Sequence, residues 1–395
     1  MKIVTVEEMR ALDRETIRDG VPGHLLMERA GQGAFQEIRR FLGRLEPQHR
    51  QRLTILAGKG NNGGDAYVVA RLAAHASLSA TVYATCTVDE LTGDAKKHAL
   101  AAKRCVRIVP CDRLPDDALT PGTVIIDGLL GTGATGALRP PCDAFVAQIN
   151  AANLPVIALD IPSGLDGDTG QVADTAIHAD LTITMALPKR GLLTPEGLRH
   201  SGVLRCIDIG IPNEAVENTA GVGDALFSSD IAPLLRRRPH DGHKGTFGHV
   251  LIAGGSRWYG GAPFLAASAA LRSGAGLATV AIPEGCLPPT SGVLAALIVR
   301  RLPSGETGVL GPKACAPLVE LASRAQAIVF GPGIGTSPAS AAALKVLADQ
   351  PLPLVLDADA LRLAARHRDM LVREGDTILT PHPGEMRALL SGLGL

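Results

Sequence analysis

Short apolar runs that lack strict polar alternation constrain the fold of this 395-residue chain more than any other feature. Strands that are buried on both faces read as near-continuous apolar runs, which is typical of parallel sheets. Helical stretches separate the runs, and this alternation predicts βαβ units and a doubly wound α/β sheet. The runs of the first half are Leu53–Ala57, Thr81–Ala84, Val124–Ile126, Val156–Leu159, Leu181–Ala186 and Cys206–Ile209.

Two helices precede the first of these strands. Thr5 and Glu8 form a capping-box pattern, which predicts a helix start, and a second helix follows Pro22. A second strand and helix series begins after residue 245, with helices at Ala262–Ser273 and from Pro383 onward. Its strands are predicted at Val250–Ala253, Leu277–Ala281, Ile328–Phe330, Leu354–Leu356 and Thr377–Leu379.

The pattern breaks between the two series. We therefore expect domains at residues 1–220 and 243–395, joined by a connection at 221–242. The basic triplet Arg236-Arg237-Arg238 lies in this connection. A phosphate-binding patch is one interpretation of the triplet, and a solvated linker face is the favoured one.

Charge and cysteine content narrow the function classes. Lys plus Arg and Asp plus Glu both total 39, so no basic excess is available for phosphates, and we expect neither nucleic acid nor membrane as a partner. The seven cysteines are scattered without a C-x-x-C pair, which predicts reduced thiols in a cytoplasmic protein. No apolar run approaches the ~18 residues of a membrane span.

A glycine-rich octet, residues 58–65 (GKGNNGGD), separates the first strand from a helix. Gly58, Gly60 and Gly63 match G-x-G-x-x-G, a weak signal for a pyrophosphate site at a helix N-terminus. The acidic residue that a dinucleotide fingerprint places after the next strand is missing, and no P-loop Lys-Ser/Thr follows. The Asn and Asp oxygens suit a cation as well as a ligand.

Two further loops carry polar groups at strand ends. Asp127 opens a Gly- and Thr-rich loop over 127–136, and Asp160 opens the segment DIPSGLDGD over 160–168. Each loop alone could be a simple turn. Three such loops at the carboxyl ends of parallel strands predict one shared site, because ligands bind at that edge.

Together, GNNGGD, D-x-L-x-GTG and DIPSGLDGD resemble the NAD(P)H-hydrate epimerase family, the YjeF N-terminal type, over about residues 1–215. The segments HKGTFGH (243–249), GPGIG (331–335) and TPHPGE (380–385) resemble the ADP-dependent NAD(P)H-hydrate dehydratases, which have a ribokinase-like fold. The whole chain is thus similar to bifunctional NAD(P)H-hydrate repair enzymes. This resemblance implies a Rossmann-like three-layer αβα epimerase domain, followed by an incomplete ribokinase-like α/β domain.

The resemblance also implies roles for individual residues. Asp160 would be the catalytic acid/base and would contact the damaged ring, and Asn62, Asp127 and Ser163 would hold a potassium ion. Substrate contacts in the first half would be Asn61, Asn62, Gly63, Gly64, Asp65, Gly131, Thr132, Gly133, Ala134, Thr135, Gly136 and Ala137. Those in the second half would be Gly333, His382, Pro383, Gly384, Glu385, Met386, Arg387 and Ala388. For His382, an alternative is that it orders the turn before a helix.

Some family features are absent from this sequence. Ala66 stands where relatives often carry Gly, and the family's later ADP-binding segments have no counterpart before Leu395. The string GVGD at 221–224 precedes the second domain and is not assigned their role. We therefore expect intact epimerisation and impaired dehydration, with potassium, ADP and magnesium as cofactors, NAD(P)H-hydrate as substrate, and a homo-oligomer. The alternatives are an NAD-dependent oxidoreductase and a non-catalytic nucleotide-binding module.

Overall fold

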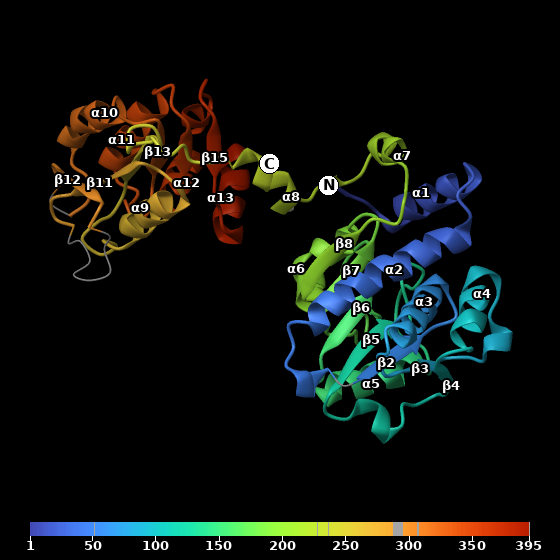
Figure 1. Ribbon diagram of the computed structural model, residues 1–395. Helices are drawn as coiled ribbons and strands as arrows, with labels where there is room; N and C mark the ends of the chain where they lie inside the picture. Colours follow the sequence, from blue (N-terminus) through green and yellow to red (C-terminus); the bar gives the residue numbers. More distant parts are fainter. Residues whose placement is uncertain (51, 227, 236, 287–294, 306–307, 395) are drawn as a thin grey trace. The chain divides into compact units, whose positions relative to one another are not determined.

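The chain forms two compact units, Met1–Leu235 and Arg236–Leu395. A computed structural model describes residues 1–50, 52–226, 228–235, 237–286, 295–305 and 308–394 (Figure 1). The division between the units falls inside the predicted connection at 221–242. Arg236, the first residue of the basic triplet, lies outside the described residues, and the Arg238 guanidinium stacks 4.1 Å from the centre of the Phe247 ring.

A seven-stranded sheet, parallel throughout, is the centre of the first unit. The strands lie side by side in the order β4-β3-β2-β5-β6-β7-β8. The chain therefore builds the sheet outward on one side from β2 and then on the other side from β5, and the strand order reverses between these two strands. The strands are β2 (Arg52–Ala57), β3 (Ala80–Ala84), β4 (Arg107–Pro110), β5 (Thr123–Gly128), β6 (Val156–Leu159), β7 (Leu181–Met185) and β8 (Val203–Ile207). A short antiparallel pair, β1 (Lys2–Ile3) with β9 (Gly223–Asp224), ties the predicted connection to the chain's start.

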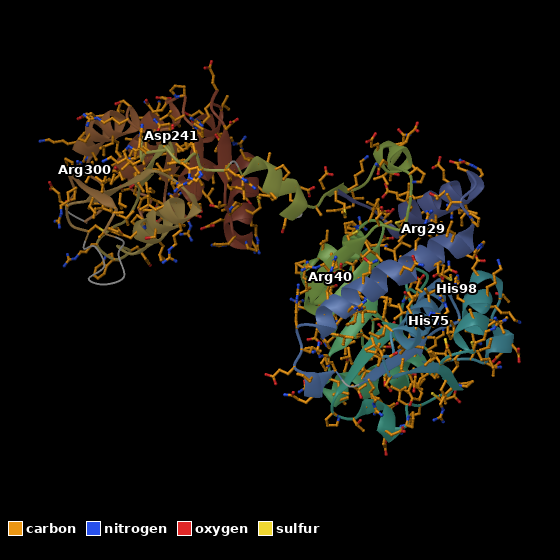
Figure 2. The ribbon with its side chains drawn as sticks, viewed as in Figure 1. Arg29, Arg40, His75, His98, Asp241 and Arg300 are labelled. Atoms are coloured by element: carbon orange, nitrogen blue, oxygen red, sulfur yellow. The ribbon has the colours of Figure 1, made fainter. Side chains whose placement is uncertain are left out.

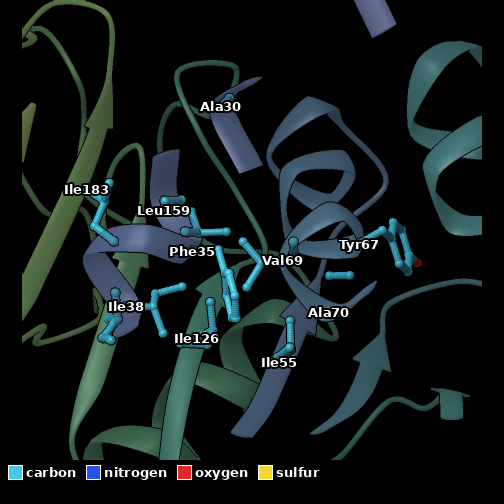
Figure 3. Close-up of a cluster of buried hydrophobic side chains, with 14 of the residues drawn as sticks. Ala30, Phe35, Ile38, Ile55, Tyr67, Val69, Ala70, Ile126, Leu159 and Ile183 are labelled. Carbon is cyan, nitrogen blue, oxygen red and sulfur yellow. The ribbon is translucent and has the colours of Figure 1, made fainter. Parts of the chain in front are cut away.

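Helices cover both faces of this sheet. Side chains of α1 (Val6–Arg18), α2 (Gly23–Leu42), α3 (Asn61–His75) and α4 (Gly93–Ala102) form one core with strand residues such as Ile55 (Figure 3). The next residue, Leu56, belongs to a second core with α5 (Cys142–Ala152). Successive strand residues point to opposite faces, so burial of both explains the missing polar alternation. The remaining helices are α6 (Pro195–Ser201), α7 (Asn213–Asn218) and α8 (Ser228–Ile231).

A polar cluster joins three of the helices that cover the first face. Arg71 of α3 donates to both carboxylate oxygens of Glu28 on α2, at 2.7 and 2.6 Å. His98 of α4, which is labelled in Figure 2, places Nδ1 3.6 Å from the same carboxylate, and its Nε2 lies 3.1 Å from the His24 carbonyl. The cluster holds α2, α3 and α4 against one another.

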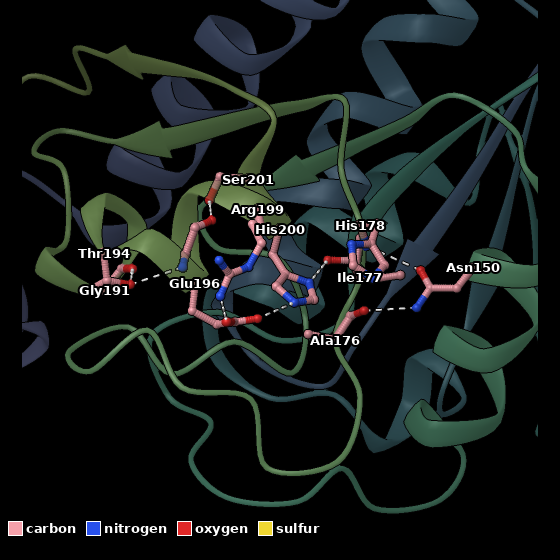
Figure 4. A network of polar contacts seen from close by, with 11 residues as sticks. Asn150, Ala176, Ile177, His178, Gly191, Thr194, Glu196, Arg199, His200 and Ser201 are labelled. Carbon is pink, nitrogen blue, oxygen red and sulfur yellow. Dashed lines mark hydrogen bonds and ion pairs between the residues drawn. The ribbon is translucent and has the colours of Figure 1, made fainter. Parts of the chain in front are cut away.

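A second network anchors the long segment between β6 and β7 (Figure 4). Asn150 of α5 donates to the Ala176 carbonyl at 2.9 Å and accepts from the His178 N–H at 3.2 Å. The His200 ring of α6 stacks on His178 with 4.2 Å between ring centres, and its Nδ1 lies 3.0 Å from the Ile177 carbonyl. This segment contributes residues to the candidate site, so the network restrains one wall of it.

The second unit contains a six-stranded parallel sheet of order β12-β11-β10-β13-β14-β15. Side chains of α9 pack on one face, and those of α10, α11 and α12 pack on the other. The strands are β10 (His249–Ala253), β11 (Leu277–Pro283), β12 (Ile298–Leu302), β13 (Ala327–Phe330), β14 (Leu354–Leu356) and β15 (Thr377–Leu379). The helices are α9 (Ala262–Ser273), α10 (Cys315–Ala322), α11 (Pro338–Ala348), α12 (Asp359–Arg366) and α13 (Pro383–Leu393). Two parallel α/β sheets confirm the predicted fold class.

In the two parallel sheets, the sequence prediction missed β4 and β12 and misplaced β8, predicted at Cys206–Ile209; it also missed the short pair β1 and β9. The strands β4, β8 and β12 share one feature. All three are edge strands, and β12 carries Arg300 and Arg301 while β4 ends on Pro110. Edge strands tolerate charge and proline because one side faces away from the ladder. They therefore lack the apolar run that marks the central strands. Within the described parts of the chain, no helix is long and apolar enough to cross a membrane.

Candidate functional site

The first unit has a cavity of about 1050 Å³ at the carboxyl ends of its central strands. Its walls come from the segments after β2, β5 and β6, and from α1 at the chain's start. The reversal of strand order between β2 and β5 lies at this edge, which is where open α/β sheets bind ligands. The structure therefore brings together the three loops that the sequence assigned to one site.

The glycine-rich octet starts α3, with Gly60 as its N-cap. A Cβ on Gly58 would lie 1.8 Å from the Leu129 carbonyl oxygen, and a Cβ on Gly63 would lie 2.0 Å from that of Gly58. Both glycines are therefore required by contacts within the protein. Gly60 has open space around its Cβ position, and it lines the cavity together with Asn61, so the N-terminus of α3 faces the cavity.

The predicted substrate contacts divide into two groups. Asn61, Asn62, Asp65, Asp160 and the whole loop 131–137 line the cavity. Arg10 of α1 also lines it and donates to the Thr132 carbonyl at 2.8 Å, which fixes that loop. Gly63 and Gly64 lie behind the wall, where a Cβ on Gly64 would meet the Met27 sulfur at 2.4 Å.

The three predicted potassium ligands converge below the cavity wall at Leu130. Asn62 Nδ2 donates to the Leu130 carbonyl at 2.6 Å, and the Leu130 N–H donates to Ser163 Oγ at 3.0 Å. Asp127 is fully buried and accepts from Ser163 Oγ at 2.7 Å, from Ser163 N at 2.8 Å and from Leu129 N at 3.2 Å. Burial raises the pKa of Asp127 to about 6, although these donors oppose the shift.

Asn62 Oδ1 is buried and has no hydrogen-bond partner among the described residues. A buried acceptor without a donor costs free energy, so such atoms call for an explanation. Hydrogen bonds through the Leu130 backbone link Asn62 to the Ser163 hydroxyl and, through it, to the buried Asp127 carboxylate. Such hard oxygens suit an alkali or alkaline-earth cation. Asn62, Asp127 and Ser163 therefore fit the potassium site that the resemblance implies.

Asp160 follows β6 in a left-handed backbone conformation, with φ of 61°. Its Oδ1 accepts from Lys189 Nζ at 2.5 Å, and from Thr184 Oγ1 and the Met185 N–H, both at 3.2 Å. Lys189 is 1% exposed, and its ammonium also donates to Thr184 Oγ1 at 3.1 Å and to the Met185 carbonyl at 2.9 Å. All three N–H donors of Lys189 are used, so the residue is a fixed cation within the site.

The sequence reasoning missed Lys189 and Asp13. Lys189 comes shortly after the predicted strand at Leu181–Ala186, so its place after a strand end was the available signal. Asp13 comes from α1, whose packing over the cavity no sequence pattern indicates. Burial and the Asp160 charge raise the pKa of Asp13 to about 6, while Lys189 opposes the shift. Burial, Asp160 and Asp13 raise the pKa of Asp65 well above its ordinary value.

In the second unit, the predicted contacts lie after β13 and β15. Gly333 has φ of 68°, and a Cβ there would lie 2.6 Å from the Tyr259 Cβ. His382 is the N-cap of α13, because its Nδ1 accepts from Gly384 N at 3.0 Å and from Glu385 N at 3.4 Å. His382 therefore orders the turn before α13, and the ligand contact stays a prediction. Pro383, Gly384, Met386, Arg387 and Ala388 are exposed, and Glu385 is buried.

Comparison with known proteins matches the two parts of the chain to two different families. Residues 23–191 match the family model of the YjeF-related protein N-terminus, and residues 250–394 match that of the NAD(P)H-hydrate dehydratases. A yeast protein of known structure covers 58% of this chain and 98% of its own, with 22% identity and a TM-score of 0.50, which shows the fold of the first unit.

Two curated relatives match almost the whole chain, and both are named bifunctional NAD(P)H-hydrate repair enzymes. The one from Coxiella burnetii is 39% identical over 383 residues, which cover 97% of this chain and 74% of the relative. The one from Salinibacter ruber is 37% identical over 413 residues, which cover 98% of this chain and 75% of the relative. This chain therefore belongs to the family of bifunctional NAD(P)H-hydrate repair enzymes.

Proposed function

We propose that the first unit interconverts the R and S epimers of hydrated NADH and NADPH. The observation that carries the proposal is the Lys189-anchored Asp160 carboxylate at the wall of a dinucleotide-sized cavity. In the hydrated cofactor, the hydroxyl sits on a ring carbon bonded to the ring nitrogen. Loss and return of this hydroxyl inverts the carbon, and both steps need a positioned acid or base.

The two oxygens of Asp160 have different roles in this proposal. Oδ1 is saturated, because it accepts from Lys189, Thr184 and the Met185 N–H. Oδ2 is therefore the oxygen that is free to act on the substrate. A Cβ on Gly131 would lie 3.6 Å from Oδ2, so glycine keeps the approach to this oxygen open.

Several cavity groups suit the rest of a dinucleotide. The N-terminus of α3 faces the cavity, and free N–H groups at a helix N-terminus favour phosphate. Arg10, Lys59 and Arg139 also line the cavity and add positive charge. Its volume of about 1050 Å³ is at the upper end of ordinary ligand pockets, as a substrate with two nucleotides requires.

Asn62, Asp127 and Ser163 would hold potassium below the loop at Leu130. Bound there, the cation would orient oxygen ligands and neutralise the buried Asp127 carboxylate. The unpartnered Asn62 Oδ1 supports this part of the proposal. The Leu130 carbonyl accepts from Asn62, so the same contacts position the loop that lines the cavity.

We further propose that the second unit dehydrates the S epimer with ADP and magnesium. The match of residues 250–394 to the NAD(P)H-hydrate dehydratase family supports this. Gly333 and the segment His382–Ala388 would contact the hydrated ring, since they follow the carboxyl ends of β13 and β15. Cytoplasmic location, homo-oligomerisation and impaired dehydration stay predictions.

The experiment starts from the purified R epimer of hydrated NADH, with potassium and with or without ADP and magnesium. Chromatography over time separates R, S and NADH, and buffer alone gives the spontaneous exchange. Faster appearance of S supports the epimerase, and ADP-dependent NADH supports the dehydratase. Asp160→Asn should abolish the acceleration of exchange, whereas Asp89→Asn, which removes an exposed carboxylate outside the cavity, should retain it.

A non-catalytic nucleotide-binding module is the second candidate function. It predicts that the folded protein binds the hydrated cofactor without accelerating exchange. A wild-type protein that binds but leaves the exchange rate at that of buffer would overturn the epimerase proposal. An oxidoreductase is less well supported, because Thr85 and Cys86 directly follow β3 and the first acidic residue, Asp89, comes late for a contact with ribose.

A further inference from the structure

We propose that Asp65 is a second catalytic carboxyl, which works as the general acid opposite the Asp160 base. This inference rests on the proposed epimerase function. Asp65 lies in the first turns of α3, is 8% exposed and lines the same cavity as Asp160. The two carboxyls reach the cavity from different elements, one from α3 and the other from the end of β6.

The contacts of Asp65 distinguish it from Asp127 and Asp160. Asp127 accepts three hydrogen bonds, and Asp160 has an ion pair with Lys189. Across the described ranges, Asp65 accepts no hydrogen bond and has no cation within 4 Å. A buried carboxylate without donors is costly, whereas a neutral carboxyl keeps one O–H to donate.

The surrounding charges also favour the protonated form of Asp65. Burial is the largest cause that raises the pKa of Asp65, and the negative charges of Asp160 and Asp13 add to it, while Lys189 opposes them. Paired carboxyls in unlike environments are a recurring way to separate an acid from a base. Asp160 has the fixed ammonium of Lys189, and Asp65 has none, so the proton belongs on Asp65.

The step balances as a proton transfer through the substrate. Asp65 gives its proton to the ring hydroxyl, the carbon–oxygen bond breaks, and its electron pair leaves with water. The ring nitrogen lone pair forms a carbon–nitrogen double bond, so the reacting carbon becomes planar and the ring carries a positive charge. A water then adds its oxygen to the other face and gives a proton to Asp160. One proton has moved from Asp65 to Asp160, and exchange with solvent restores both.

The test measures kcat and KM of R-to-S exchange for the wild type, Asp65→Asn, Asp65→Glu and Asp89→Asn. Acceleration by the wild type is established first, so failure of the proposed function is distinguished from failure of this inference. Asp65→Asn should lower kcat by about 100-fold or more and leave KM within about threefold, as loss of a general acid does. Asp89→Asn is the matched control, since it removes an exposed carboxylate of the same unit that does not line the cavity.

The pH profile gives an independent readout. The wild-type kcat should fall at high pH, where Asp65 loses its proton. Asp65→Glu should retain part of the activity, and the pH at which its kcat falls (the alkaline limb of the profile) should be displaced. This variant also provides the test if Asp65→Asn does not fold, as judged by circular dichroism. Asp65→Asn with more than about a tenth of the wild-type kcat, or Asp65→Glu with an undisplaced limb, would overturn the inference.

Discussion

Replacement of Lys189 by methionine should destabilise the first unit because it leaves the Asp160 carboxylate without its cation. Lys189 is 1% exposed and the Asp160 side chain 13% exposed, so water replaces little of the lost interaction. Breaking a buried ion pair by removing one partner costs about 3–5 kcal/mol. Thr184 Oγ1 and the Met185 N–H still donate to Asp160 in the variant. We therefore expect the lower end of the range, about 3 kcal/mol.

The assay is thermal unfolding followed by circular dichroism and calorimetry, with the transition of the first unit assigned by comparison with the wild type. For a unit of this size, about 3 kcal/mol corresponds to a midpoint about 6–12 °C lower. Lys97→Met is the matched control. Its ion pair with Asp94 spans 2.8 Å, but the Lys97 side chain is 65% exposed, so the expected loss is at most about 0.5 kcal/mol.

A double-mutant cycle separates the orphaned charge from simple loss of packing. Asp160→Asn removes the charge, and asparagine tolerates the left-handed backbone at this position. Lys189→Met combined with Asp160→Asn should therefore be more stable than Lys189→Met alone by at least about 1 kcal/mol. A loss under about 1 kcal/mol for Lys189→Met, or strictly additive single effects, would refute the reasoning.

Four other predictions test separate parts of the structure. Potassium added to a choline-based buffer should raise the melting midpoint of the first unit. Asn62→Leu should remove this response, because it removes the unpartnered Oδ1. A wild-type midpoint that does not change with potassium would contradict the cation site. Gly58→Ala should lower the free energy of unfolding by about 3 kcal/mol or more, since its Cβ would lie 1.8 Å from a backbone oxygen. Gly60→Ala, with open space around its Cβ, should lower it by about 1 kcal/mol at most. Equal losses in thermal unfolding would count against the close approach at Gly58. His382→Ala should destabilise the second unit by about 1 kcal/mol in denaturant titrations and His382→Asn should recover most of this, because asparagine also caps helices. The raised pKa of Asp13, about 6, means that the folded state holds a proton that the unfolded state releases near pH 3.8. This group alone should therefore lower stability by up to about 3 kcal/mol as pH rises from 4 to 7, and Asp13→Asn should make the fall smaller by that amount, while Asp65 and Asp127 keep the remainder.

The candidate site was predictable from the sequence to the extent that its groups follow strand ends. Asn62, Asp127, Asp160 and Ser163 all stand within a few residues of a recognisable strand, and parallel strands bring their carboxyl ends to one edge. Asp13 could not be found in this way, because it lies on α1, and only packing places that helix over the cavity. The pairing of Lys189 with Asp160 was likewise invisible, since 29 residues separate them along the chain.

The glycine-rich octet shows a second limit of prediction from the sequence. Its G-x-G-x-x-G spacing indicates a close backbone approach but not the partner of that approach. The structure shows that Gly58 and Gly63 approach the protein's own carbonyl groups, and that Gly60 is the one facing open space. His382 is similar, since the same residue suits a ligand contact or a helix cap, and the position of its Nδ1 shows the cap.

The sequence by itself determined the layered α/β fold, its two-part division and the edge of the sheet that carries the site. These follow from local patterns, because apolar runs, caps and glycine turns each depend on a few neighbouring residues. Only the tertiary structure decided the charge arrangement, in which Lys189 pairs with Asp160 while no cation of the described residues pairs with Asp13 or Asp65. Burial and distance set how strongly charges interact, and both arise only when segments far apart in the chain pack together.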